Sequence, residues 1–249
     1  MPPIKIELTS LVITAKSPLA IGSGYARGLL DRTVVRSASG LVYIPGSVLK
    51  GKTRAACELL MQHCKLGNIH SPHPESMYNH TDPCLVCKLF GRPGHPSTLR
   101  WHNLHLDRQW VDAVRPSRRY KNVFGQTFER TQIQMSRRRN LAAEAHLFSG
   151  EFTANHLRFE ARPTLTGWLD LTPVSLADKD AVYYELIVLF AGLRMLTTLG
   201  GNVSRGAGII DLELPETVKA GGKEISIQSQ LDHFQLLDLC FDESAEETG

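Results

Sequence analysis

A strand pattern is followed directly by a helical pattern in the stretch Leu41-Val42-Tyr43-Ile44-Pro45-Gly46-Ser47-Val48-Leu49-Lys50. The three residues at 45–47 separate the two patterns. The apolar residues at 41–44 and those at 33–36 flank the turn signal Ser39-Gly40, which predicts a hairpin. Pro45-Gly46-Ser47 ends this hairpin, and we expect Ser47 to cap a helix over about 48–63. The residues that this helix is expected to bury are Leu49, Ala56, Leu59 and Leu60.

The flanking sequence continues the succession of strands and helices. Alternating apolar and polar residues predict a strand at 4–13, strand pairs at 99–107 and 146–171, and a last strand at 208–214. A second helix is predicted over 179–199, with a stop at Gly200-Gly201. Its apolar face consists of Val182, Leu186, Leu189, Leu193 and Leu196. Strands separated by two helices favour an α+β fold, a ferredoxin-like (RRM-like) core with an antiparallel sheet and two main helices on one face.

Length and composition are those of a globular protein. The 249 residues are 42% hydrophobic and 21% charged, enough for a core that needs no disulfide support. No apolar run is long enough to span a bilayer, and the first residues lack the apolar segment of a secretory signal. We therefore expect a cytoplasmic protein without a membrane partner. We also expect a single domain over 1–249, because no repeat or low-complexity linker divides the sequence.

Positive charge is concentrated in one segment. The whole chain has a formal net charge of +3, whereas 115–139 holds eight cations against Glu129 alone. These cations are Arg115, Arg118, Arg119, Lys121, Arg130, Arg137, Arg138 and Arg139. Tyr120, Phe124 and Phe128 alternate with them, which favours a nucleic-acid strand whose phosphates are neutralised while its bases stack. A solvated basic loop without a partner is the alternative.

Two glycine-containing loops are candidate anion sites. The first comprises Gly22-Ser23-Gly24 and Asp31, followed by the helix start at Ser47 with Lys50, Lys52 and Arg54. Bare amide groups at a helix start attract phosphate, although the spacing is too short for a nucleotide-binding P-loop. The second loop, 200–208, presents Ser204 and Arg205 among four glycines. The alternatives are a capped helix with a basic edge and a helix end that turns into a strand.

Four of the five cysteines lie within 57–87, which indicates a metal site or reduced thiols rather than disulfides. Cys84-x-x-Cys87 is a zinc knuckle, in which one turn directs both thiolates to one point. Cys64 and His80 are the candidates to complete a tetrahedral site, and Cys57, His70 and His73 are their rivals. The insertion at 64–98 is polar and proline-rich, so a structural Zn²⁺ would stabilise it. A pair of buried thiols is the alternative.

Several of these motifs occur in an order that resembles one known family. They are Pro18-Leu19-Ala20-Ile21-Gly22-Ser23-Gly24, Gly28-Leu29-Leu30-Asp31, 44–51, Cys84-Leu85-Val86-Cys87-Lys88-Leu89-Phe90-Gly91 and 200–208. Together they resemble the RAMP superfamily over about 18–210. Within it, the chain is most similar to the backbone subunit of type III CRISPR effector complexes.

The resemblance implies a ferredoxin-like core that stacks with other RAMP subunits along a guide (CRISPR) RNA. It also implies a protruding thumb hairpin that kinks the guide, which we place in an insertion at 108–145. The residues expected to contact RNA are Gly22, Ser23, Gly24, Arg36, Ser47, Lys50, Lys52, Arg54, Arg115, Arg118, Arg119, Arg137, Arg138, Arg139, Ser204 and Arg205.

The resemblance further implies metal-dependent cleavage of complementary target RNA by an aspartate in a Gly-x-x-Asp loop. Gly28-Leu29-Leu30-Asp31 matches that loop, so Asp31 is the expected catalytic residue, with Mg²⁺ or a similar cation. Arg32 departs from the pattern and either pairs with Asp31 or holds a phosphate.

Two other functions fit the sequence. One is a guide-binding structural subunit without chemistry, in which Asp31 is a loop residue. The other is the related RAMP ribonuclease that processes guide precursors, which commonly has two ferredoxin-like halves and a histidine-based site. This chain has one half, and four of its ten histidines lie in the zinc insertion, which disfavours that enzyme.

Overall fold

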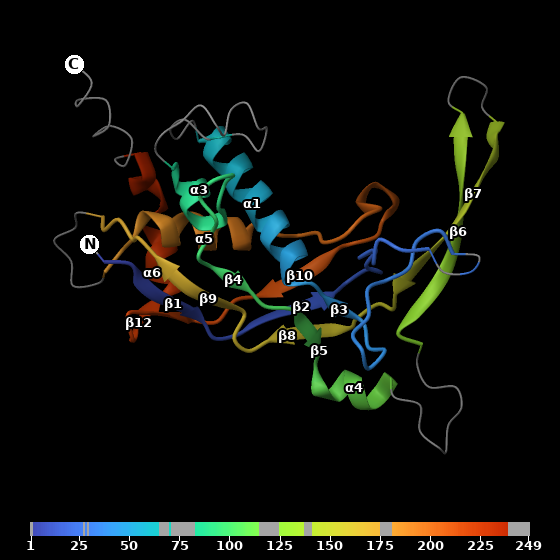
Figure 1. The fold of residues 1–249 in the computed structure, drawn as a ribbon, viewed down its shortest axis with the longest axis horizontal. Helices are drawn as coiled ribbons and strands as arrows, with labels where there is room; N and C mark the ends of the chain where they lie inside the picture. Colours follow the sequence, from blue (N-terminus) through green and yellow to red (C-terminus); the bar gives the residue numbers. More distant parts are fainter. Residues whose placement is uncertain are drawn as a thin grey trace.

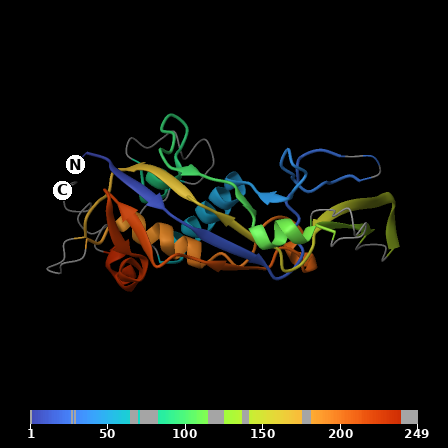
Figure 2. The same ribbon diagram turned by 90° about the horizontal axis from the view of Figure 1, so that it is seen from below.

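Two five-stranded antiparallel sheets make the body of the protein, with the longest helices packed on one side of them (Figures 1 and 2). The structure is a computed structural model that describes residues 2–26, 28, 30–64, 70, 83–114, 125–136, 141–174 and 181–238. The predicted α+β class with antiparallel strands is confirmed. None of the described helices has the length and hydropathy needed to cross a membrane.

The first sheet has the order β12-β11-β1-β9-β4. Its strands are β1 (Ile4–Leu8), β4 (Arg100–Trp101), β9 (Leu165–Leu169), β11 (Thr217–Ala220) and β12 (Lys223–Ser226). The second has the order β10-β2-β8-β5-β3. Its strands are β2 (Leu11–Ala15), β3 (Tyr43–Ile44), β5 (Leu104–Leu106), β8 (Arg158–Ala161) and β10 (Ile210–Glu213).

The alternating pattern at 4–13 belongs to two strands, not one. Ile6 and Leu8 of β1 and Leu11 and Ile13 of β2 are all buried, but β1 and β2 lie in different sheets. The prediction of one strand is therefore wrong, because the buried positions change from even to odd numbers across Thr9-Ser10, and this change of phase marks the break between the strands. The pair at 99–107 is likewise divided, with β4 in one sheet and β5 in the other.

The predicted hairpin around Ser39-Gly40 is reduced to a short contact. Arg36 and Val42 form an isolated antiparallel bridge, and the Ser37 amide donates to the Leu41 carbonyl over 2.8 Å. The strand that follows, β3, pairs with β5 instead.

The helix α1 (Gly46–His63) confirms the predicted position but corrects two details. Its N-cap residue is Pro45, which has no side-chain donor or acceptor, and Ser47 is exposed, so the predicted Ser47 cap is wrong. The Gly46 amide instead donates to Asn103 Oδ1 over 2.9 Å. Leu59 is 52% exposed, and the buried face is Leu49, Thr53, Cys57 and Met61.

The buried face of α1 packs on α5 (Tyr184–Arg194), whose residues 184–193 are all buried. Cys57 Sγ lies 3.3 Å from the Val188 carbonyl oxygen of α5. A Cβ added to Gly192 would lie 2.3 Å from Cys57 Sγ, so the two helices approach closely only because residue 192 is glycine. Contact with α5 therefore buries every fourth residue of α1, a spacing that the sequence did not predict.

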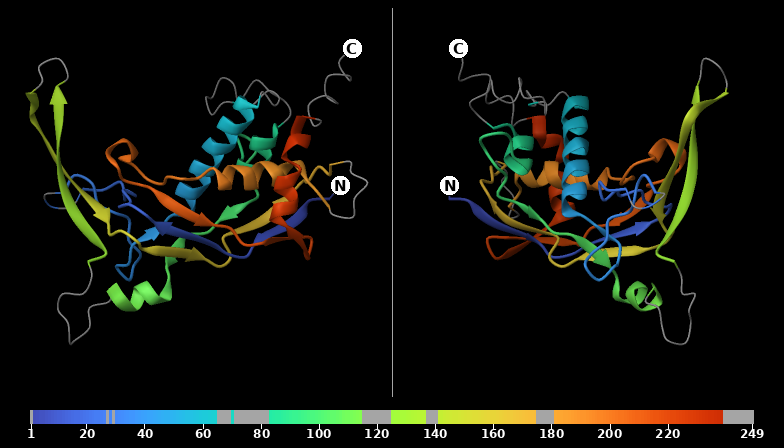
Figure 3. Two further views of the ribbon diagram at one scale, coloured as in Figure 1. Left: turned by 180° about the vertical axis from the view of Figure 1, so that it is seen from behind. Right: turned by 45° about the vertical axis from the view of Figure 1, so that its right-hand side comes forward.

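The other elements lie at the margins of the body. They are α3 (Leu85–Phe90), α4 (Arg108–Val114), α6 (Ile227–Asp232) and two 3₁₀ turns, η1 (Val203–Arg205) and η2 (Phe234–Asp238). A separate two-stranded hairpin, β6 (Thr127–Ser136) and β7 (Leu141–Thr153), projects from one end of the body (Figure 3). Asp31, Arg36 and the two glycine loops meet at its foot.

Candidate functional site

The two glycine loops of the sequence meet at the foot of the hairpin. The Gly201 amide donates to the Ala20 carbonyl over 2.9 Å, and the Gly208 amide donates to the Pro18 carbonyl over 2.8 Å. The Leu19 amide donates to Thr153 Oγ1 at the end of β7 over 2.9 Å. These hydrogen bonds hold segments that are far apart in sequence together in one corner of the molecule, at the foot of the hairpin.

Glycine is required at two positions in this corner. Gly200 has φ +83° and Gly208 has φ +87°, a conformation that side chains rarely adopt. A Cβ at 200 would also lie 2.7 Å from the Ala20 carbonyl oxygen, and one at 208 would lie 2.6 Å from that of Leu199. These glycines therefore serve the close backbone packing of the loops.

One side of the hairpin, which we call the aromatic face, carries Phe128, Arg130, Gln132, Phe148 and Phe152. The rings of Phe128 and Phe152 stack with centroids 6.0 Å apart, and the Arg130 guanidinium lies 5.9 Å from the Phe152 centroid. Phe128 remains 42% exposed.

The loop at 200–208 closes against this aromatic face. Arg205 lies 5.6 Å from the centroid of the Phe148 ring and donates from Nη1 to Gln132 Oε1 over 2.7 Å. A small cleft of about 120 Å³ lies beside it, lined by residues that include Gly22, Phe148 and Gly201. The result is a surface on which the Phe128 ring and the Arg130 and Arg205 guanidinium groups are exposed, next to glycine backbone.

The other side of the hairpin, which we call the acidic face, carries Glu129 directly opposite Glu151 and Thr131 directly opposite Ser149. The loop that contains Asp31 is bonded along this strand edge. The Asp31 amide donates to the Ser149 carbonyl over 2.9 Å, and the Ser149 amide donates to Asp31 Oδ2 over 2.8 Å. The Glu151 amide then donates to the Arg32 carbonyl over 2.9 Å. Asp31 is exposed, so its carboxylate is accessible from solvent.

Glu151 joins this loop to both strands of the hairpin. Its Oε2 accepts from the Val34 amide over 2.8 Å, and its Oε1 accepts from Arg36 Nη2 over 2.5 Å and from Thr127 Oγ1 over 2.6 Å. Burial raises the pKa of Glu151, but these donors and the Arg36 charge together outweigh burial and lower it below its usual value. A cleft of about 590 Å³ opens here, lined by Gly28, Leu30, Thr33, Val34, Arg36, Glu129 and Glu151.

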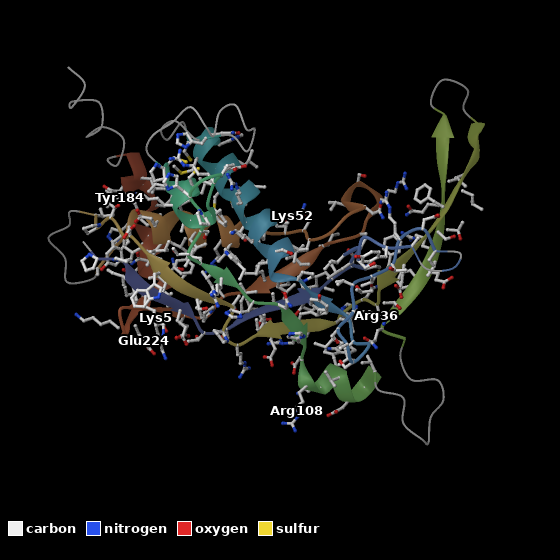
Figure 4. All side chains as sticks on the ribbon, in the orientation of Figure 1. Lys5, Arg36, Lys52, Arg108, Tyr184 and Glu224 are labelled. Atoms are coloured by element: carbon white, nitrogen blue, oxygen red, sulfur yellow. The ribbon has the colours of Figure 1, made fainter. Side chains whose placement is uncertain are left out.

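The cations predicted at the start of α1 do not gather around one anion site. Arg54 pairs with Glu58 over 2.8 Å and donates to the Gly91 carbonyl over 2.8 Å, which ties α1 to the end of α3. Burial, followed by the charge of Arg54, lowers the pKa of Lys50. Figure 4 shows Lys52 on α1, apart from Arg36 beside the foot of the hairpin.

The remaining predicted RNA contacts divide into two groups. Ser23 Oγ lies 2.7 Å from Thr33 Oγ1, and Ser204 is exposed in η1 beside Arg205. The basic residues outside the described part of the chain are Arg115, Arg118, Arg119, Arg137, Arg138 and Arg139.

A second cluster, at the far side of α1, can hold a metal ion. The ligand atoms of His70, Cys84 and Cys87 all lie within 4.8 Å of one another, with His70 Nδ1 3.6 Å from Cys87 Sγ. The hydrogen bond from the Cys87 thiol lowers the pKa of Cys84, and the same hydrogen bond, followed by burial and by the Cys84 charge, raises the pKa of Cys87. One thiolate therefore forms readily, as metal binding requires.

The structure brings together only part of the predicted ligand set. Cys84 and Cys87 are in the cluster, and His70, named as a rival, joins them. Cys64 is exposed at the end of α1 and is not in this group, while His80 and His73 lie outside the described residues. Cys57 is buried against α5, and burial raises its pKa to about 12.

The model of the RAMP superfamily matches residues 12–211. The chain belongs to the RAMP superfamily. The matched part of this RAMP protein runs from β2 into β10 and includes both glycine loops, the metal cluster and the hairpin. The strands β11 and β12 lie beyond it.

A solved structure is also similar to this RAMP protein. It is a chain of the cryo-EM structure of the Type III-B Cmr-beta bound to cognate target RNA, with 14% sequence identity and a TM-score of 0.49. The match covers 84% of the present chain and 96% of that chain. No curated protein matches the sequence.

Sequence reasoning missed Glu151, Thr127 and Gln132 of the RAMP protein. Glu151 contacts Arg36, which is 115 positions away in sequence, and no local pattern signals such a contact. The alternation of Phe128, Arg130 and Gln132 with Glu129 and Thr131 is the one signal that could have indicated a two-sided strand.

Proposed function

We propose that this RAMP protein is a CRISPR RNA-binding backbone subunit of a type III interference complex. In this proposal it binds a guide RNA, packs against other RAMP subunits in the cytoplasm, and cleaves complementary target RNA with Asp31. The observation that carries the proposal is the hairpin, which presents rings and guanidinium groups on one face and holds the Asp31 loop along the edge of β7.

The aromatic face suits the guide strand. Phe128 offers an exposed ring for base stacking, and Arg130 and Arg205 supply charge for phosphates. The adjoining glycine loops let the sugar-phosphate backbone of the guide RNA approach closely, since Gly22, Gly24 and Gly201 have no side chain. Because these contacts address phosphates and ring faces, guide binding should depend on salt and little on sequence.

The acidic face suits the target strand and its cleavage. Asp31 Oδ2 is held by the Ser149 amide, and Oδ1 receives no hydrogen bond from the described residues. A carboxylate so placed can accept the proton of a 2′-hydroxyl whose oxygen attacks the adjacent phosphorus. The attack forms a 2′,3′-cyclic phosphate as the bond to the 5′-oxygen breaks, and that oxygen takes a proton from water. The hydrogen bond from the Ser149 amide to Oδ2 fixes the orientation of the carboxylate during the proton transfer from the 2′-hydroxyl.

A single exposed carboxylate fits the metal requirement of the proposal. Mg²⁺ is commonly bound through one or two carboxylates together with phosphate oxygens, so Asp31 and the RNA can hold it jointly. When bound, the ion would neutralise charge that develops at the phosphate. The chain itself supplies the oxygen of Asp31 and the backbone frame around it.

Three architectural features accompany this function. We propose a ferredoxin-like core, supported by the order β10-β2-β8-β5 with α1 after β2 and α5 after β8. The domain spans 1–249, with a thumb insertion at 108–145 to which β6 and part of β7 belong. A zinc-binding insertion at 64–98 carries the metal cluster.

Zinc is the proposed metal of that cluster. One nitrogen and two sulfur ligands within 4.8 Å of each other fit the tetrahedral radius of Zn²⁺, whose bonds to sulfur are about 2.3 Å long. The fourth ligand is proposed among Cys64 and His80. Such a site stabilises a short polar insertion and does not take part in RNA chemistry.

One observation favours the alternative of a guide-binding subunit without chemistry. The hydrogen bond between Asp31 and the Ser149 amide is by itself a sufficient structural reason for an aspartate. The two functions differ in whether the charge of Asp31 is needed.

An assembled complex decides between them. Matched labelled RNA should be cut at regular intervals with Mg²⁺ and not with EDTA. The variant Asp31→Ala should bind guide normally and lose the cuts served by this subunit. Asp211→Ala, which removes an exposed carboxylate paired with Lys16, is the matched control and should cut normally. Persistent cutting by Asp31→Ala would leave only the structural function.

A further inference from the structure

The position of Asp31 depends on the hairpin. Residues 33–35 are bonded to 21–23 of the first glycine loop, through the Ser23 amide to Thr33 and the Val35 amide to Ile21. Asp31 and Arg32 are instead bonded to Ser149 and Glu151 of β7. The loop therefore spans two parts of the molecule, and its acidic residue lies on the hairpin side.

Glu151 is the side chain that joins these parts. Its two oxygens bind the loop at the Val34 amide and at Arg36, and they bind β6 at Thr127. Arg36 itself donates to Thr127 Oγ1 over 2.7 Å and to the Gly40 carbonyl over 3.1 Å. Its guanidinium is thus directed into protein contacts on the acidic face.

The charge of Glu151 makes this junction dependent on Arg36. The Glu151 side chain is 10% exposed, so its carboxylate requires a compensating charge. Glu129 lies directly opposite, and like charges at such positions destabilise a strand pair. The positive charge of Arg36 offsets both the burial of the Glu151 carboxylate and its repulsion by Glu129. The ion pair therefore stabilises this junction more than an exposed ion pair would.

We infer that Glu151 and Arg36 are positioning residues for Asp31 in target cleavage, and this inference rests on the proposed function. They fix which peptide of β7 faces Asp31, and so they fix where its carboxylate meets the target strand. Neither side chain touches the reacting atoms. Arg36, which was predicted from sequence to bind RNA, acts through the loop instead.

The test is the single-turnover rate of target cutting by the assembled complex at saturating Mg²⁺ and saturating target. Glu151→Gln and Arg36→Met should each slow cutting by about 10- to 100-fold, because displacement of a reactive group by about 1 Å can cost about 100-fold. Guide binding and target binding should stay within about twofold of wild type. The loss therefore falls on the rate at saturation, whereas a general folding defect would also weaken binding.

The conservative variant and the control separate positioning from charge removal. Arg36→Lys keeps the cation but not the planar fork, so its rate should lie between those of wild type and Arg36→Met. Glu160→Gln removes a carboxylate paired with Arg162 over 2.9 Å and should cut at the wild-type rate. If Glu151→Gln fails to assemble, Thr127→Val decides, since it removes one donor and should slow cutting by about fivefold.

Asp31→Ala in the same assay distinguishes the two levels of the proposal. If Asp31→Ala is inactive but Glu151→Gln and Arg36→Met, or the substitute Thr127→Val, cut at the wild-type rate, the positioning inference is wrong. If Asp31→Ala cuts normally, the proposed function is wrong instead.

Discussion

Asp31 and Ser149 are hydrogen-bonded to each other twice, through the Asp31 amide to the Ser149 carbonyl and through the Ser149 amide to Asp31 Oδ2. The aspartate therefore has a structural role that is independent of any chemistry. This structural role can be separated from the proposed catalytic one, because an asparagine side chain keeps an acceptor oxygen and loses the charge.

Asp31→Asn should preserve the fold of the loop and abolish target cutting. The amide oxygen of asparagine can still accept from Ser149, so the free energy of unfolding should change by less than about 0.5 kcal/mol. Asp31→Ala leaves the Ser149 amide without that partner and should cost about 1 kcal/mol. Urea unfolding and the cutting assay measure the two effects, and normal cutting by Asp31→Asn would remove the catalytic role.

Arg205→Ala should weaken guide binding and reduce its dependence on salt. The variant loses the guanidinium over Phe148 and one proposed phosphate contact, so the slope of log K against log salt should fall by about 0.7 for a single strand. Filter binding at several salt concentrations measures the slope. Arg162→Ala, one residue beyond β8, is the control, and an equal effect of both substitutions would contradict a local contact.

Removal of the metal should unfold the insertion around α3 first. Cys84→Ser, Cys87→Ser and His70→Ala should each lower zinc content well below one equivalent and lower the melting temperature. Cys57→Ala should retain zinc, because Cys57 packs on α5. Elemental analysis and thermal melts provide the measurement, and full zinc content in His70→Ala would exclude that residue as a ligand.

Stability should depend on Glu151 at neutral pH but not in acid. Its pKa is lower in the folded state than in the unfolded chain, where glutamate titrates near about 4.3. Its contribution is therefore complete above about pH 5 and is lost as the pH falls through the folded pKa, which lies below the unfolded value. Glu151→Gln should cost about 1–3 kcal/mol at pH 7, and this difference from wild type should shrink as the pH of the urea titrations is lowered stepwise from about 4.3. A difference that stays constant with pH would contradict the role of its charge.

Gly192→Ala should destabilise the contact between α1 and α5. The new methyl group would meet Cys57 Sγ at 2.3 Å, and overpacking of this kind costs about 1–3 kcal/mol. The same substitution in a Cys57→Ala background should cost much less, because the obstructing sulfur is gone. Equal costs in the two backgrounds, measured by chemical unfolding, would contradict the observed contact.

Local pattern was enough to predict the class of the fold and much of its framework. The apolar spacing around Leu49 and Leu186 located α1 and α5, and alternation located β8 and β10. The periodicity of apolar side chains can be read from a short stretch of sequence, so it does not require knowledge of the tertiary structure. The prediction of one strand at 4–13 overlooked the change of phase at Thr9-Ser10, which separates β1 from β2.

The candidate site was less accessible to sequence. Asp31 and Arg205 stand in recognisable loops, whereas Glu151 acquires its role only when Arg36 is brought to it across the fold. His70 could not be preferred over Cys64 or His73 as a metal ligand, because the spacing of an irregular insertion does not fix which side chains converge. Long-range contacts, not local propensity, decided both cases.

The alternation along β7 also limits which changes of length the gene can accept. Phe148 and Phe152 point to the aromatic face, while Ser149 and Glu151 point to the acidic face. A codon inserted or deleted within this stretch would exchange the faces for every residue beyond it, whereas a change of two codons would preserve them. Natural relatives and engineered versions of this hairpin should therefore differ in length by even numbers of residues, or compensate with a bulge.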